Sequence, residues 1–275
     1  WCGEFALRCV VWPCLLVGDA DGICLVLRPL CPAAALALAC PAQAELSFDT
    51  TSDDTIAYVE SNLLGIFYHE LGHALIDILG LPIFGQEEDA ADVLSIFLID
   101  AFYEEESAVQ LAYDAAFGFL GEAEANSEIA FWDVHGPDLQ RYYNTVCLFY
   151  GANPEEREDV AQDLGLPEER AEYCPEEYDQ AAQSWGGALD EIVHDKGGKT
   201  LALGDFEVDS DGGSLTADVV RAEVAALNQE FRLPEDLLIS VIPCGEANAY
   251  YDPQRVEIVM CTEFADALVE MSPEM

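Results

Sequence analysis

The stretch FYHELGHALIDILG, residues 67–80, contains two histidines one helical turn apart, with a glutamate directly after the first. On an α-helix, residues four apart share a face, so His69 and His73 can both direct an imidazole nitrogen at one metal ion. Glu70 lies about 100° further round the helix, beside such an ion, where a base can take a proton from metal-bound water. The alternative is an ordinary buried helix that carries these three residues by chance, so a third ligand is needed to favour a metal centre.

The apolar residues around this stretch predict one long helix. From Asp54 onwards they recur at three- and four-residue steps, and Gly80 and Pro82 then end the pattern. A second helix is predicted to begin near Glu87. The region 45–193 is therefore expected to be nearly all α-helical and to hold the zinc-binding catalytic centre. Further helices are predicted in it at residues 106–120, 138–150, 155–163 and 175–193.

The start of the second helix, EEDAAD at residues 87–92, offers a third ligand. Glu88 and Asp92 are four residues apart and share a helix face. Because the linker GLPIFGQE is short, an antiparallel hairpin can return Glu88 to the two histidines. Two histidines and a glutamate form a known catalytic set for Zn²⁺, and Asp92 would bond the second nitrogen of a ligand histidine and fix its tautomer. The alternative is a solvated acidic face, or a helix start whose acids lie at the positive end of the helix dipole.

Zinc hydrolases also need a group that stabilises the oxyanion of the tetrahedral intermediate. The segment WDVHGPDLQRYYNTVC, residues 132–147, offers a polar and aromatic cluster. His135 is the first candidate and Tyr142 or Tyr143 the second, with Arg141 in the same segment. A merely structural role for the segment is the alternative, because spacing alone does not fix geometry.

The composition changes at residues 194–214, which are rich in glycine and break the helical pattern, so we expect a linker there. Residues 215–275 predict an α/β segment that packs onto the metal-binding helix and completes one domain. The fold class is therefore α+β, mostly helical, with a small β-sheet from the C-terminal segment. The segment predicts a helix at 216–231, strands at 237–243 and 256–261, a turn at 248–255 and a short helix from residue 262.

The formal net charge of −44 limits the partners of the chain. So many carboxylates repel phosphate backbones and anionic lipids, which argues against nucleic-acid binding and stable membrane insertion. The expected partner is a peptide or protein substrate, and no pattern indicates an oligomeric state.

Residues 1–44 are expected to be a signal peptide together with sequence upstream of the true start. A short apolar run, PAAALALACPAQA at residues 32–44, ends in the small-x-small pattern that signal peptidase accepts. The run is too short to span a bilayer. A lipid anchor on Cys40 is the alternative, although Ala37 stands where a lipobox prefers leucine. The mature protein is expected in the periplasm or outside the cell.

The cysteines support export, because six of the ten lie before residue 45 and the remaining four form an even set. Sequence order predicts the disulfides Cys147–Cys174 and Cys244–Cys261. A zinc site made of all four cysteines is the alternative, but the sequence contains no C-x-x-C pair among them.

Four stretches of the chain resemble the bacterial putative metallopeptidase family, an exported group with an H-E-x-x-H centre followed by E-x-x-A-D. The resemblance covers most of residues 54–269. The stretches are FYHELGHALIDILGLPIFGQEEDAAD, VHGPDLQRYYNTVCLFYG, LPEERAEYCPEEY and LPEDLLISVIPCGEANAYYDPQRVEIVMCTEF.

The resemblance implies a zincin-like fold and a gluzincin-like centre. In such a centre zinc is bound by His69, His73 and Glu88, and Glu70 is the catalytic base. The resemblance further implies that three residues lie at or near the centre: Asp92, His135 and Arg141.

The order of the segments departs from the family. The family's CGxxNAxYDP segment precedes the H-E-x-x-H helix, whereas here it follows at residues 244–253. The chain therefore looks circularly permuted, with a broken tandem pair of domains as the alternative. Permutation requires residues 236–261 to pack against the helix at 54–79, whereas a broken pair would leave them as a detached lobe.

Together these features predict a zinc-dependent peptidase that hydrolyses peptide bonds with zinc-activated water and Glu70 as general base. The alternative is a non-catalytic metal-binding protein of the cell envelope that keeps the fold for interaction.

Overall fold

The computed structural model describes residues 51–125, 129–194, 196–208 and 210–273. The predicted signal segment at 1–44, with the alternative anchor Cys40, lies outside these residues. The described residues belong to one compact unit.

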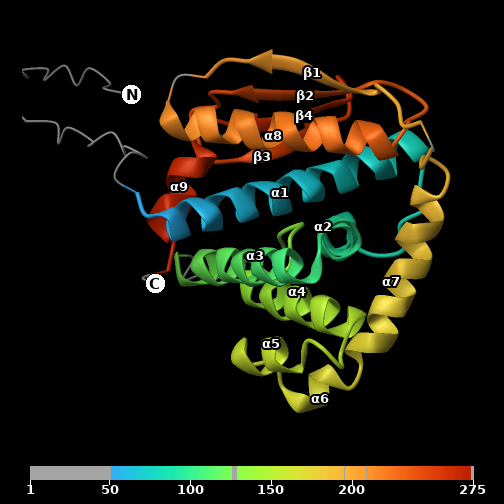
Figure 1. Cartoon of the computed structure of the whole chain (residues 1–275), viewed down its shortest axis with the longest axis vertical. Coiled ribbons are helices and arrows are strands. Elements are labelled where there is room, and N and C mark those ends of the chain that lie inside the picture. Colours follow the sequence, from blue (N-terminus) through green and yellow to red (C-terminus); the bar gives the residue numbers. More distant parts are fainter. Residues whose placement is uncertain (1–50, 126–128, 195, 209, 274–275) are drawn as a thin grey trace, which may run out of the picture. The chain divides into compact units, whose positions relative to one another are not determined.

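The first part of this unit is helical, as Figure 1 shows. Its elements are α1 (Asp53–Leu79), α2 (Glu87–Phe102), α3 (Glu105–Ala125), α4 (Asp138–Ala152), α5 (Glu158–Asp163), α6 (Glu168–Ala171) and α7 (Cys174–Leu189).

Helix α1 has well-defined signals at both ends. The Ser52 hydroxyl caps its start by accepting a hydrogen bond from the Thr55 backbone N–H at 3.1 Å. Gly80 ends it in the left-handed conformation, at φ 62°, which glycine adopts without a steric penalty. The turn that follows redirects the chain, so that α2 packs across α1 (Figure 1).

The second part of the unit adds a four-stranded sheet with two further helices. The strand order is β1-β2-β4-β3; β1, β2 and β4 run parallel, and β3 is antiparallel to β4 at one edge. The elements are β1 (Leu201–Phe206), α8 (Asp211–Glu230), β2 (Leu237–Ile242), β3 (Ala249–Asp252), β4 (Glu257–Cys261) and α9 (Phe264–Met271).

The sheet packs directly against the helix that carries the histidines. Helix α1 contacts β3 and β4, while α8 contacts β1 and β2 and also α1 (Figure 1). The Tyr251 hydroxyl on β3 donates a hydrogen bond to Asp77 on α1 at 2.8 Å. The C-terminal strands are therefore not a detached lobe, and the packing that permutation requires is present.

The mostly helical α+β prediction is confirmed, but two strands were missed. Strand β1 and the first residues of α8 lie inside 194–214, which we expected to be a linker. Strand β3 lies inside 248–255, which we expected to be only a turn. Both strands lie at the sheet edges, where fewer apolar residues are needed than in the central strands, so their sequences carry little of the strand pattern.

Both predicted disulfides are present. Cys147–Cys174 joins α4 to the first residue of α7, and Cys244–Cys261 joins the loop before β3 to the end of β4. Among the described residues, none of the helices combines the length and the apolar content needed to span a bilayer.

Candidate metal centre

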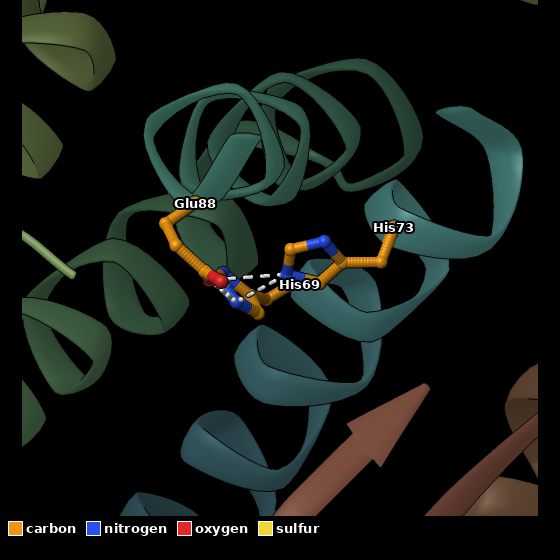
Figure 2. Close-up of side chains that lie close together, drawn as sticks. All are labelled: His69, His73 and Glu88. Carbon is orange, nitrogen blue, oxygen red and sulfur yellow. Dashed lines mark hydrogen bonds and ion pairs between the residues drawn. The ribbon is translucent and has the colours of Figure 1, made fainter. Parts of the chain in front are cut away.

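Three side chains from α1 and α2 meet at one point, as Figure 2 shows. The Nε2 atoms of His69 and His73 lie 3.2 Å apart. The Oε2 atom of Glu88 lies 3.2 Å from the first nitrogen and 3.1 Å from the second. These three atoms therefore form a nearly equilateral triangle.

This triangle fits a tetrahedral metal ion. Zinc binds imidazole nitrogen and carboxylate oxygen at about 2.0–2.1 Å, which places two donors of a tetrahedron about 3.3–3.4 Å apart. The observed separations of 3.1–3.2 Å differ from that value by only a few tenths of an ångström. The donor chemistry and the spacing of this site thus fit one divalent ion, with a fourth position open for water or substrate.

Close packing of the two helices brings Glu88 to the histidines. Gly72 lies between His69 and His73, and a Cβ atom built on it would be 2.9 Å from the Cα atom of Ala91 on α2. Because a side chain at this position would force the helices apart, a glycine is required for the ligands of α1 and α2 to meet.

The first candidate ligand, His69, contacts a carboxylate that belongs to a buried ion pair. The Nδ1 atom of His69 lies 2.7 Å from Asp92 Oδ1. Arg141, from α4, donates two hydrogen bonds of 2.8 Å to the same carboxylate. Burial raises the pKa of Asp92, but the hydrogen bonds to Arg141 and His69 outweigh it and lower that pKa to about 2. Asp92 is therefore a carboxylate, and it directs the His69 Nε2 lone pair at the triangle.

The second ligand histidine is held by a residue that sequence analysis did not single out. The Nδ1 atom of His73 lies 2.8 Å from Glu87 Oε1. Glu87 comes directly before Glu88, and its charge was read only as a favourable acid in the first turn of a helix. Each ligand histidine thus has its own carboxylate, but half of the Glu87 side chain is exposed.

Glu70 lies beside the triangle and is buried, with 5% of its surface exposed. Burial raises its pKa, while the neighbouring imidazoles partly lower it again. A carboxylate with a raised pKa is a better proton acceptor than an exposed one, as a general base requires.

The structure brings His135 to the centre but not Tyr142. The Nε2 atom of His135 lies 3.0 Å from Glu88 Oε2, and the His135 backbone N–H donates to Asp133 at 3.1 Å. The Tyr142 hydroxyl instead donates to the Leu164 carbonyl at 2.7 Å. The Tyr142 hydroxyl therefore points towards the end of α5, and the structure does not bring this predicted oxyanion group to the centre. The reserve candidate, Tyr143, packs edge-on against the Tyr142 ring.

Two hollows flank the centre. One has a volume of about 730 Å³ and the other about 650 Å³. Both are lined by residues of the centre and of the β3 edge, and five residues are shared: His69, Glu70, His135, Asn248 and Ala249. A cleft thus extends to both sides of Glu70, along the edge of the sheet.

Comparison with known families agrees with this geometry. The family model described as putative metallopeptidase matches residues 39–189 and 214–274. The chain belongs to the putative metallopeptidase family. The two matched segments contain every residue of the centre, and membership of the putative metallopeptidase family supports a metal ion and a peptidase role. No curated protein and no solved structure matches the chain.

Proposed function

We propose that this protein is a zinc-dependent peptidase with Glu70 as its general base. One observation carries the proposal: three donor atoms converge at the separations of a tetrahedral zinc site, and a buried carboxylate that is not among them lies alongside. His69, His73 and Glu88 would hold the ion. Zinc, when bound, lowers the pKa of a coordinated water and polarises the carbonyl of the scissile bond.

Glu70 would take the proton of the attacking water and deliver it to the leaving amine. Its position beside the donor atoms suits this role, and burial shifts its pKa from the usual range of a glutamate towards neutral pH. A site that only stores metal has no use for such a group, and this favours an enzyme over a non-catalytic binding protein.

His135 would stabilise the oxyanion. Its hydrogen bond to Glu88 raises its pKa, which favours the protonated, donating imidazole. Its side chain is less buried than those of His69 and His73, so it can turn from Glu88 towards a substrate oxygen. Arg141 acts through Asp92 and is a positioning residue.

Strand β3 would align the substrate. Among the described strands it pairs with β4 alone, and its residue Ala249 lines both hollows together with Asn248. An extended peptide can add to such an edge through backbone hydrogen bonds. The two disulfides favour an oxidising compartment, so we place this activity outside the cytoplasm.

The experiment compares wild type with Glu70→Gln for zinc content, by elemental analysis, and for cleavage of a quenched fluorescent peptide library. We expect Glu70→Gln to keep one zinc per chain and to lose about 10²–10⁴-fold in cleavage rate. Glu106→Gln, which makes the same charge change at an exposed position of α3, is the control and should match wild type.

Two results would refute the proposal. A zinc-loaded wild type that cleaves no peptide would favour the non-catalytic alternative. Zinc that remains stoichiometric in Glu88→Ala would remove Glu88 from the ligand set.

A further inference from the structure

The loop between α3 and α4 exposes an unusual set of apolar side chains. Large apolar side chains seldom cluster in water on a soluble protein, and such patches mark interaction surfaces. We call these four residues the apolar rim: Ile129 at 56% exposure, Phe131 at 81%, Trp132 at 86% and Val134 at 62%.

The apolar rim is tied to the metal centre by its own loop. His135 follows Val134 directly and reaches Glu88 at 3.0 Å. Three residues of chain span at most about 11 Å, so Trp132 lies within that distance of His135 along the backbone. An extended peptide covers the same distance with about three residues.

The loop forms one wall of the larger hollow. Ile129, Asp133 and His135 line this hollow, and Asn248 and Ala249 line it from the sheet. The exposed Phe131 and Trp132 belong to the same loop and lie directly between Ala130 and Asp133, which both line the hollow. A chain that lies along β3 in this hollow therefore passes between a backbone edge and the loop that carries the apolar rim.

The charge of the protein indicates which kind of molecule can bind to the apolar rim. With a net charge of −44, a second copy of this chain and an anionic lipid surface are both repelled. Asp133 and Glu122 add carboxylates to the lining of the hollow. A polypeptide with apolar and basic side chains fits both the apolar rim and these charges.

Resting on the proposed function, we propose that the apolar rim binds an aromatic or large aliphatic side chain of an extended polypeptide substrate. The bound side chain would lie within about three residues of the scissile bond. Phe131 and Trp132 are the specificity-determining residues.

The experiment measures binding without cleavage, in the full chain carrying Glu70→Gln and loaded with zinc. The probes are two fluorescent decapeptides of glycine, serine and lysine, one with a central phenylalanine and the other with serine in its place. The test variant adds Phe131→Ser and Trp132→Ser, which are exposed positions whose change should not affect folding. The control adds Phe84→Ser, which is 99% exposed but lines a different groove.

We expect the phenylalanine peptide to bind at least tenfold more tightly than the serine peptide. The double variant should lose this preference, whereas Phe84→Ser should stay within twofold of the parent. No preference in the parent, an unchanged preference in the double variant, or an equal loss in Phe84→Ser would each overturn the inference.

Two further outcomes would assign the apolar rim to another occupant and also overturn the inference. The first is a dimer, seen by light scattering, that dissociates in the double variant while peptide binding persists. The second is binding of the parent to phosphatidylcholine vesicles that is lost in the double variant while peptide binding is unchanged. The proposed function can fail separately from this inference. If zinc-loaded wild type cleaves no peptide but the peptide preference still depends on Phe131 and Trp132, the apolar rim is a peptide-binding surface on a protein that is not a peptidase.

Discussion

The two proposed ligand histidines, His69 and His73, differ in how firmly a neighbouring carboxylate holds each ring. Asp92 behind His69 is mostly buried and is itself paired with Arg141, whereas Glu87 behind His73 is half exposed. A carboxylate that is fixed on both sides holds an imidazole more firmly than one that samples solvent. We therefore expect Asp92→Asn to lower zinc affinity about 100-fold and Glu87→Gln about 10-fold.

Competition with a fluorescent chelator would measure both affinities. Asp92→Asn should also lower the free energy of unfolding by up to about 3–5 kcal/mol, because the buried Arg141 loses the charge of its nearest carboxylate and keeps Glu122 at 3.9 Å. Glu106→Gln is the matched control for the change of charge. Equal losses in Asp92→Asn and Glu87→Gln would show that burial of the carboxylate does not matter.

Zinc affinity should rise with pH. Burial lowers the pKa of His69, but hydrogen bonds to Asp92 and Glu88 raise it more, to about 9 in the metal-free protein. Zinc binds neutral imidazole, so the proton must leave first. Below that pKa we expect about a tenfold gain in affinity per pH unit from this proton, and a plateau above it. Chelator competition from about pH 6.5 to 9.5, corrected for protonation of the chelator, checks this; a flat profile would contradict it.

At the residue scale, spacing is informative only within one helix. The pair His69 and His73 could be predicted because a single helix fixes their relative directions. Tyr142 could not, because Arg141 and Tyr142 are about 100° apart on α4, and only packing decides which of the two faces α2. Glu87 was missed for a related reason. Its partner His73 lies on another helix, and any acidic residue is favourable at the exposed start of α2.

At the element scale, the contact between α1 and α2 depends on Gly72. We expect Gly72→Ala to cost about 1–3 kcal/mol of unfolding free energy through overpacking against Ala91, and to weaken zinc binding by separating the ligands. Gly65→Ala on the same helix is the control, because its new Cβ would meet only Ala115 at 3.9 Å. This control should be neutral or stabilising by up to about 1 kcal/mol. Denaturant unfolding and chelator competition measure the two effects; an unchanged Gly72→Ala would contradict the packing argument.

The helices and the two central strands, β2 and β4, were largely predictable from the sequence, whereas the edge strands β1 and β3 were not. Helical periodicity repeats over many residues, so α1 and α2 were each expected close to their observed starts. Strand β1 pairs with β2 across helix α8, so its pairing depends on contacts that no local pattern records. Strand β3 pairs with its neighbour β4, but with four residues it is too short for an alternating strand pattern to stand out.

At the scale of the whole molecule, the order of segments can be tested by rearrangement. Helix α9 contacts α1, and in Figure 1 it lies beside the beginning of that helix. We expect a chain that runs from 200 to 272, through a glycine-serine linker, to 52–193 to keep the fold. Its zinc affinity should stay within about threefold of the parent, because none of the ligands or their supports changes neighbours. The rearranged chain is made with linkers of two lengths, so that strain in one linker can be recognised. If both rearranged chains are unfolded, the permuted arrangement is refuted.

The seven-residue connection between α1 and α2 would give a metal ion bound at the centre a mechanical role. His73 and Glu88 are fifteen positions apart, so an ion that grips both acts as a removable cross-link across a small ring of chain. The tip of that ring presents Phe84, which is almost wholly in water. In protein molecules without the ion, this connection would open more readily, and other proteases would cleave it. The protein that survives proteolysis would therefore be enriched in molecules that hold the metal ion.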